Sequence, residues 1–204
     1  MRGEALTTAI SGENMSDRML AKLALGGLSA ALVALAATAS PLQGTHHGTM
    51  APMNARAHER AATEPFLAHG KTMNLQSFKG QPVMLWQMAT WCPSCAVGLQ
   101  TLAQNQALID ASNLKVIILR DYQNGGYPGE DMEKFVAANA PTLLHDPHFL
   151  IGEDTAALFK LYNPRQLVDV YYLIEPNGQV ALTASAPSMS LDKIEQFIRK
   201  GGPS

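Results

Sequence analysis

Two cysteines, Cys92 and Cys95, are the only thiols in this chain of 204 residues, and two residues separate them. A bridge across so short a loop restricts the unfolded chain very little, so the pair is not a stabilising disulfide framework. The apolar run at residues 83–88 ends shortly before Cys92, and helical periodicity follows Cys95. The pair therefore lies where a buried strand gives way to a helix, and any fold of this chain has to place it there.

This position predicts a reactive thiol at Cys92. Backbone N–H groups without partners and the helix dipole stabilise a thiolate at a helix N-terminus, and the spacing brings Cys95 within disulfide geometry. In such a pair the first cysteine attacks a substrate disulfide, and the second, one turn further in, resolves the mixed disulfide. Pro93 is tolerated because early helix positions have no intrahelical N–H bond to lose.

Two other interpretations of the cysteines carry less weight. A zinc site with His145 and His148 would need a gap between the ligand pairs that matches no compact zinc module. These histidines flank a turn at Asp146-Pro147 and are expected at the surface. A purely structural cysteine pair would make its position between strand and helix a coincidence.

Composition and charge argue against a disordered chain and against a nucleic-acid-binding protein. Of the residues, 47% are apolar and 16% charged, which is too apolar for a disordered chain. The formal net charge of −2 offers no basic face, so we expect no nucleic-acid partner. The length fits one domain with an extension. We assign residues 65–204 to that domain and expect no organic cofactor in it.

The N-terminal part predicts export. Residues 23–39 are almost wholly apolar or small, follow Arg18 and Lys22, and close with Ala37-Thr38-Ala39, as in a signal peptide cleaved after Ala39. An uncleaved single-helix membrane anchor is the alternative, because the run is near the lower length limit for spanning a bilayer. A core helix would need a polar face, which the run lacks. In both leading cases the domain faces outward, in the periplasm or at the outer face of the cytoplasmic membrane. Residues 40–64 are expected to form a flexible linker.

From residue 65 onward, strand-like and helix-like segments alternate, which predicts an α/β domain with a β-α-β unit around the cysteines. Glycine turns predict two hairpins, one around His69-Gly70 and one around residues 175–178. The expected strands are residues 83–88, 114–119, 170–174 and 179–182, with an extended pair at 143–144. The expected helices run from the cysteines to about Ile109, over 131–138, over 154–162 and over 193–200, the last with Ser190 as its cap.

Three segments resemble the thioredoxin superfamily, specifically its exported, often membrane-anchored TlpA/ResA-like branch of thiol-disulfide oxidoreductases. They are Ala89-Thr90-Trp91-Cys92-Pro93-Ser94-Cys95, the hairpin leading into residues 75–82, and residues 172–178. The resemblance implies a thioredoxin fold, a central mixed β-sheet flanked by helices, with an N-terminal β-hairpin and a helical insertion near residues 129–140. It further implies an enzyme that exchanges disulfides with protein thiols through W-C-P-S-C, and a membrane or exported redox partner. In this fold Trp91 is expected at the surface beside the active site, and Tyr171 is expected to flank that surface too.

Three positions depart from the family pattern. Asp169 stands where the family places a cis-proline facing the cysteines, Trp86 replaces a buried acid, and Gly98 replaces a glutamate common in cytochrome-maturation members. The usual proton acceptors are therefore missing, which weakens a role in cytochrome c maturation. We hypothesise that Asp169 is a proton relay for Cys95 or tunes the Cys92 thiolate by repulsion. A solvated loop aspartate is the alternative.

The expected site therefore consists of Trp91, Cys92, Pro93, Ser94, Cys95 and Asp169. The rival function is a copper-binding or copper-delivery protein of thioredoxin fold, using the two cysteines and the tether residues His46, His47, Met50 and Met53. The same tether residues also fit a plain linker. A peroxidase of the peroxiredoxin type lacks the expected threonine-to-cysteine spacing. Reduction and oxidation of partners both stay open, because residue types do not give the redox potential.

Overall fold

The computed structural model describes residues 59–201. The expected signal or anchor, most of the linker, and the tether residues His46, His47, Met50 and Met53 lie outside the described residues. Within residues 59–201 no helix has the length and apolar character needed to cross a membrane.

The strands of the described part form one mixed sheet in the order β2-β1-β5-β4-β3-β6-β7. The three central strands β3, β4 and β5 are parallel, and β6 runs antiparallel to β3. The expected central mixed sheet is therefore confirmed. The strands are β1 (Phe66–Ala68), β2 (Lys71–Met73), β3 (Val83–Met88), β4 (Lys115–Arg120), β5 (Phe149–Glu153), β6 (Asp169–Ile174) and β7 (Val180–Ala184).

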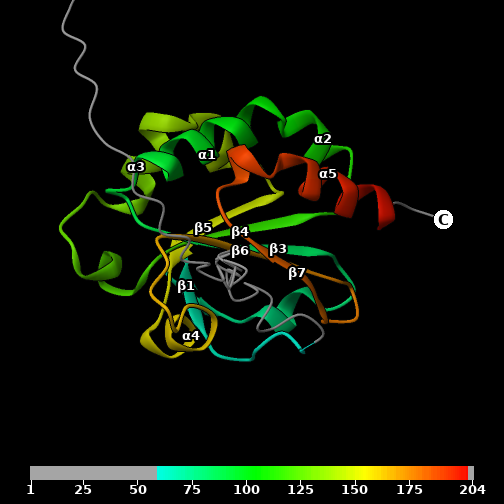
Figure 1. Ribbon diagram of the computed structural model, residues 1–204, viewed down its shortest axis with the longest axis horizontal. Coiled ribbons are helices and arrows are strands. Elements are labelled where there is room, and N and C mark those ends of the chain that lie inside the picture. The colour runs from blue at the N-terminus through cyan, green and yellow to red at the C-terminus, as the bar shows by residue number, and fades with distance from the viewer. Residues whose placement is uncertain (1–58, 202–204) are drawn as a thin grey trace, which may run out of the picture. The chain divides into compact units, whose positions relative to one another are not determined.

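Helices cover both faces of the sheet (Figure 1): α1, α2, α3 and α5 lie on one face and α4 on the other. The α-helices are α1 (Pro93–Gln104), α2 (Gln106–Asp110), α3 (Met132–Asn139), α4 (Ala156–Tyr162) and α5 (Leu191–Lys200). Short 3-10 helices are η1 (Leu75–Phe78), η2 (Tyr122–Gly126), η3 (Pro141–His145) and η4 (Pro187–Met189). Helix α3 lies within the expected insertion between β4 and β5.

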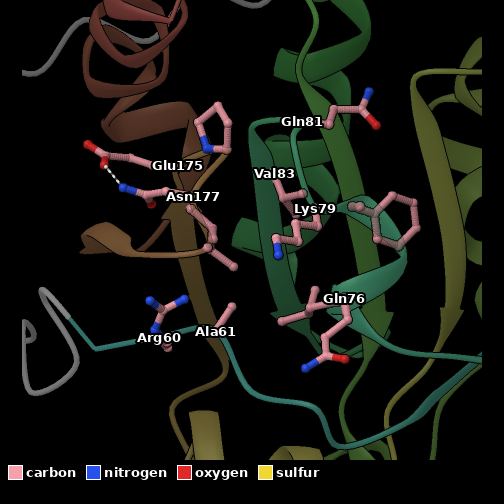
Figure 2. Close-up of a pocket in the computed structure, with 13 residues that line it drawn as sticks. Arg60, Ala61, Gln76, Lys79, Gln81, Val83, Glu175 and Asn177 are labelled. Atoms are coloured by element: carbon pink, nitrogen blue, oxygen red, sulfur yellow. Dashed lines mark hydrogen bonds between the residues drawn. The ribbon is translucent and has the colours of Figure 1, made fainter.

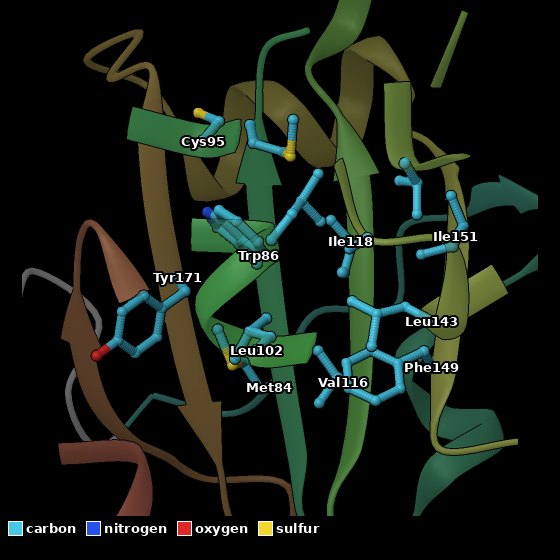
Figure 3. Close-up of a cluster of buried hydrophobic side chains, with 14 of the residues drawn as sticks. Met84, Trp86, Cys95, Leu102, Val116, Ile118, Leu143, Phe149, Ile151 and Tyr171 are labelled. Carbon is cyan, nitrogen blue, oxygen red and sulfur yellow. The ribbon is translucent and has the colours of Figure 1, made fainter. Parts of the chain in front are cut away.

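Strand β3 is buried along its whole length, as a central strand covered on both faces should be. Successive side chains point to opposite faces, so Met84 and Trp86 pack on the side of α1 with Leu102 (Figure 3). Leu85 packs on the other side with Leu158 of α4. The sheet thus has an apolar layer on each face, and Met84 and Met88 are core residues as expected.

Both predicted hairpins are confirmed. His69 and Gly70 have φ values of 49° and 69°, the left-handed pair that a two-residue turn between β1 and β2 requires. In the second hairpin, between β6 and β7, Gly178 N donates to Glu175 O at 2.8 Å and Gly178 has φ 84°. Glycine is suited to that conformation because it has no Cβ.

Two predicted elements were wrong. The helix after the cysteines is interrupted at Asn105, whose side-chain Nδ2 donates to Thr101 O at 2.8 Å, and such a side chain competes with the backbone for helical acceptors. The expected extended pair at residues 143–144 lies in η3. Strand β5, which follows η3, was not predicted because the apolar run of this strand is short and is interrupted by Gly152. A Cβ on Gly152 would lie 2.1 Å from Leu67 O, so this glycine serves the close approach of β1.

Two further expectations need correction. Tyr171 does not flank the site surface: it is buried, lies opposite Trp86 in the β3–β6 register, and points to the helical face with it (Figure 3). Its hydroxyl contacts Ser190 Oγ at 2.8 Å. Ser190 is the N-cap residue of α5, but its side chain makes no capping hydrogen bond to the helix, because Ser190 Oγ donates to Ser185 O at 2.9 Å instead.

Candidate active site

Cys92 is the N-cap residue of α1. Its backbone is extended, with φ −89° and ψ 117°, and its Sγ accepts a hydrogen bond from Cys95 N at 3.3 Å. Pro93 takes the first helical position, where no N–H is needed. The Cys92 sulfur is thereby held at the N-terminus of α1, next to a backbone N–H donor. The local sequence thus produces the geometry that the spacing predicts.

Cys95 lies deeper than Cys92. It is 0% exposed, against 5% for Cys92, and its Sγ contacts Val168 O at 3.5 Å. Burial, followed by the negative charge of Asp169, raises the pKa of the Cys95 thiol far above its ordinary range. Cys95 therefore keeps its proton until a neighbouring group removes it.

Asp169 lies beside the two sulfurs. A carboxylate oxygen of Asp169 and the Sγ atoms of Cys92 and Cys95 are all within 4.8 Å of one another. The residue begins β6 and is 9% exposed, so it is not a solvated loop residue. Burial raises the pKa of the Asp169 carboxyl, although hydrogen bonds from Trp86, Ser94 and the Ala186 backbone oppose this. Asp169 therefore holds a proton more readily than an exposed aspartate does.

Ser94 connects Cys92 to this carboxylate. Ser94 Oγ lies 3.1 Å from Cys92 Sγ and donates to Asp169 Oδ2 at 3.1 Å. A hydroxyl has one proton, so while Ser94 donates to Asp169 it accepts from the Cys92 thiol. When Cys92 is a thiolate, the same hydroxyl can turn and donate to the sulfur. Ser94 Oγ therefore lies between the Cys92 sulfur and the Asp169 carboxylate and contacts both.

Of the three departures from the family pattern, Trp86 contacts the other two. Trp86 Nε1 donates to Asp169 Oδ1 at 2.8 Å. A Cβ on Gly98 would lie 2.7 Å from Trp86 Cη2, so the indole occupies space that only a glycine at this position leaves free. Gly98 therefore makes room for Trp86, and Trp86 orients Asp169. The sequence shows the three substitutions separately, and their connection appears only in the fold.

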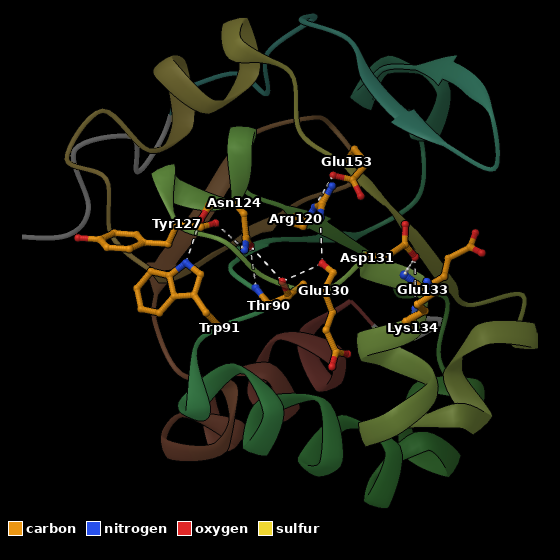
Figure 4. A network of polar contacts seen from close by, with 10 residues as sticks. All are labelled: Thr90, Trp91, Arg120, Asn124, Tyr127, Glu130, Asp131, Glu133, Lys134 and Glu153. Carbon is orange, nitrogen blue, oxygen red and sulfur yellow. Dashed lines mark hydrogen bonds and ion pairs between the residues drawn. The ribbon is translucent and has the colours of Figure 1, made fainter.

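Trp91 forms one wall beside Cys92, as expected. It is 38% exposed, its Nε1 donates to Asn124 O at 2.8 Å, and its ring lies 4.9 Å from that of Tyr127 (Figure 4). Asn124 Oδ1 in turn accepts from Thr90 N at 2.9 Å. Gln123, Asn124 and Gly125 all have left-handed backbone conformations. Sequence reasoning missed this loop, although Asn124-Gly125-Gly126 is a turn signal that could have revealed it.

Two buried acids were also missed. Asp121 follows β4 and Asp154 follows β5, and both are buried with Gln87 of β3. The carboxyl ends of parallel strands meet at one edge of a sheet, so these residues share the edge at which Cys92 follows β3. An aspartate directly after a buried strand is the sequence feature that could have revealed both residues. Strand β5 was not predicted, so only Asp121 could be recognised in this way.

The described part holds one group of three residues suited to a metal: Cys92, Cys95 and Asp169. His145 and His148 are not in it, so the zinc interpretation has no support here.

A pocket of about 270 Å³ lies elsewhere, at the far end of β3 near Val83 (Figure 2), with Arg60, Lys79 and Glu175 in its wall. It is not part of the cysteine site.

The model of the AhpC/TSA family matches residues 55–183, more than half of the chain. The chain belongs to this family. No curated protein matches it. Its structure is similar to that of a putative thiol:disulfide interchange protein DsbE from Chlorobium tepidum, with a TM-score of 0.56 and 21% identity over 71% of this chain and 96% of that one.

Two other solved structures are similar to this AhpC/TSA-family chain. One is a secreted Mycobacterium tuberculosis disulfide oxidoreductase homologous to E. coli DsbE, with a TM-score of 0.51, 17% identity, and coverage of 68% of this chain and 96% of that one. The other is a yeast mitochondrial 1-Cys peroxiredoxin, with a TM-score of 0.54, 19% identity, and coverage of 71% and 75%. At these identities the likeness shows the fold, and the expected thioredoxin fold is confirmed.

Proposed function

We propose that this AhpC/TSA-family protein is an exported thiol-disulfide oxidoreductase that acts on protein partners through W-C-P-S-C. The observation that carries the proposal is the geometry of the thiols. Cys92 Sγ accepts the Cys95 N–H at the N-terminus of α1, while Cys95 is buried behind it. This arrangement gives one thiol that attacks and one that resolves.

In the proposed reaction the Cys92 thiolate attacks one sulfur of a partner disulfide. The partner's S–S bond breaks, its second sulfur leaves as a thiolate and takes a proton, and a mixed disulfide joins Cys92 to the partner. Cys95 then loses its proton and attacks Cys92 Sγ, which releases the partner's other thiol. The partner gains two electrons and two protons, and a Cys92–Cys95 disulfide forms. The reverse sequence oxidises a partner dithiol.

The proposal also includes export of the protein and the class of its partners. The apolar run at residues 23–39 supports secretion or single-helix anchoring, with the domain in the periplasm or at the outer face of the cytoplasmic membrane. The M. tuberculosis protein of similar structure is described as secreted. Protein thiols and disulfides outside the cytoplasm, and a membrane or exported redox partner, are the proposed partners. The TlpA/ResA-like branch is the proposed relationship.

Equilibration of the protein with glutathione buffers of known ratio tests the proposal. We expect a reversible Cys92–Cys95 couple, measured by thiol alkylation and mass. A potential near or below about −250 mV would make the protein a reductant, and one near about −120 mV an oxidant. Absence of a reversible couple would refute the oxidoreductase proposal. In that case, copper binding by the reduced protein, abolished in Cys92→Ser, would favour the metal-binding alternative.

We infer that Asp169 accepts the proton that Cys95 loses when it resolves the mixed disulfide. Asp169→Asn keeps the shape and a hydrogen-bond acceptor for Trp86 but cannot take the proton. We expect the resolving step at pH 7 to slow by about two orders of magnitude or more, the usual contribution of a general base. Rapid mixing with oxidised glutathione and quantification of the mixed disulfide measures this step.

The control is Glu130→Gln, which removes a charge from an exposed residue on the loop after Tyr127. If Asp169→Asn leaves the resolving rate unchanged but shifts the titration of the Cys92 thiolate, Asp169 tunes that thiolate by charge instead. If neither quantity changes, Asp169 has no part in the chemistry.

A further inference from the structure

Two sulfurs and one carboxylate converge at the N-terminus of α1. The Sγ atoms of Cys92 and Cys95 and a carboxylate oxygen of Asp169 lie within 4.8 Å of one another. The sulfurs belong to the start of α1 and the carboxylate to the start of β6. Cys95 is fully buried, whereas Cys92 and Asp169 each keep a small exposed surface. Three side chains that can ligate a metal therefore meet at a place that solvent reaches from one side.

The separations fit a tetrahedral zinc site. Zinc binds thiolate sulfur at about 2.3 Å and carboxylate oxygen at about 2.0 Å. Around a tetrahedral ion, these bonds place two sulfurs about 3.8 Å apart, and a sulfur and an oxygen about 3.5 Å apart. From separations of 4.8 Å or less, the donor atoms have to approach by little more than about 1 Å. Small rotations of the three side chains supply such a movement.

The hydrogen-bond partners of these groups carry no positive charge. Asp169 accepts from Trp86 Nε1 at 2.8 Å and from Ser94 Oγ at 3.1 Å. The backbone of Ala186 also donates to Asp169, and Cys92 Sγ accepts from a backbone N–H. Two thiolates and a carboxylate in a buried place cannot all be ionised unless a cation compensates them. A dication bound between the three groups supplies that compensation.

The donor types favour zinc over other metals. Thiolate sulfur suits zinc, Cu(I) and iron–sulfur clusters, whereas carboxylate oxygen suits harder cations. Zinc accepts both kinds of donor. Iron–sulfur clusters are usually held by four cysteines, and this chain has two. Magnesium and calcium take oxygen ligands. Three protein ligands on a tetrahedral zinc ion leave a fourth position for water.

Trp86 orients the carboxylate, as an outer hydrogen-bond partner of a metal ligand does. Its indole N–H holds Oδ1 of Asp169, and Gly98 leaves the space that the ring needs. The other oxygen, Oδ2, lies on the side of Ser94, whose Oγ is 3.1 Å from Cys92 Sγ. The hydrogen bond from Trp86 therefore turns the second oxygen of the carboxylate toward the sulfurs.

We propose that the reduced site binds one zinc ion through Cys92, Cys95 and Asp169, and that the bound metal blocks disulfide exchange. The two thiols lose their protons to solvent when the two zinc–sulfur bonds form. A Cys92–Cys95 disulfide uses both sulfurs, so zinc binding and disulfide formation exclude each other. The site needs neither His145 nor His148, which lie outside this group of ligands. The block rests on the proposed thiol exchange, whereas the metal site does not.

Titration of the full chain with zinc sulfate against a coloured chelator tests the site. We expect the reduced protein to bind one zinc ion more than the oxidised protein, which reports zinc held elsewhere in the chain. Asp169→Asn, checked for folding by circular dichroism, should bind zinc at least about tenfold more weakly, since loss of an outer partner alone costs that much. The matched control is Glu133→Gln, which removes an exposed carboxylate from α3 and should leave the affinity unchanged.

Cobalt in place of zinc reports on the ligands without a functional assay. The reduced protein should show thiolate-to-cobalt charge-transfer bands and the strong visible bands of a tetrahedral ion. Cys95→Ser should lose about half of the charge-transfer intensity, because one of the two thiolates is removed. Asp169→Asn should shift the visible bands, because a carboxylate ligand is lost. Absence of the tetrahedral bands in the reduced, unmodified protein would overturn the proposal.

Saturating zinc should slow the reduction of oxidised glutathione at least about tenfold, because a thiolate bound to the metal is not free to attack, and EDTA should restore the rate. Equal zinc affinity of Asp169→Asn and the unmodified protein would overturn the proposal, since the two cysteines alone would then hold the metal. Equal binding by reduced and oxidised protein, or an exchange rate that zinc leaves unchanged, would also overturn it. If the zinc-free protein exchanges no disulfides, the proposed function fails, and the affinities and the cobalt bands still decide whether the metal site exists.

Discussion

Cys92→Ser is expected to abolish disulfide exchange, with the rate falling at least about a thousandfold. A serine hydroxyl stays protonated at neutral pH, whereas the thiolate at the N-terminus of α1 is the attacking species. The hydrogen bond from Cys95 N to residue 92 survives the change, so the fold should be retained. The measurement is single-turnover reduction of oxidised glutathione, with the native fold checked by circular dichroism.

Cys95→Ser is the matched variant, because it removes the other sulfur of the same pair. Attack by Cys92 should proceed, and the reaction should stop at the mixed disulfide, which accumulates to one equivalent and is detected by mass. Equal activity of the two variants would contradict the assignment of Cys92 as the nucleophile. A stable mixed disulfide on Cys95 in the Cys92→Ser protein would show that the two cysteines have the opposite roles.

The folded protein is expected to lose stability as the pH rises from about 5 to 8. Asp121 and Asp154 have pKa values of about 8 and about 7 in the fold, above the ordinary aspartate value. The folded state therefore binds more protons than the unfolded chain in this range, and the free energy of unfolding must fall as the pH rises. Below the ordinary aspartate value, this contribution is fully present. We expect a loss of at least about 2 kcal/mol, since each tenfold difference in proton affinity corresponds to about 1.4 kcal/mol.

Urea unfolding of the reduced protein at several pH values measures this dependence. Asp121→Asn should flatten it, because asparagine cannot ionise, while Glu133→Gln on the exposed side of α3 should leave the slope unchanged. A free energy of unfolding that rises over the same range would show that the buried acids are ionised in the folded protein at neutral pH.

Much of the active site could be predicted from local sequence. The apolar run of β3, the glycine turns of the two hairpins and the proline after Cys92 are short-range signals. Each reflects backbone conformations and side-chain periodicities that act within a few residues. They were enough to place Cys92 at a helix N-terminus. The resemblance to thioredoxins predicted Asp169 beside the cysteines, and its carboxylate lies within 4.8 Å of both sulfurs.

The errors have a common cause. Strand β5 has a short apolar run with Gly152 in it, and that glycine is explained by the close approach of Leu67 O, a contact between residues far apart in the chain. Tyr171 is buried because its place opposite Trp86 in the sheet turns it toward the helices. Neither the register nor the approach of β1 is encoded in a local pattern.

The sequence by itself determined the chemistry available to this protein: two thiols separated by two residues, between a buried strand and a helix, in one α/β domain. The tertiary structure alone decided which groups surround them. Gly98, Trp86 and Asp169 come from three elements and are brought together because β3 pairs with β6 and α1 packs on the same face of the sheet. Asp121 and Asp154 lie at one edge of the sheet because the parallel strands β4 and β5 both end there. Such contacts join residues distant in sequence, and packing, which sets them, is a property of the whole chain.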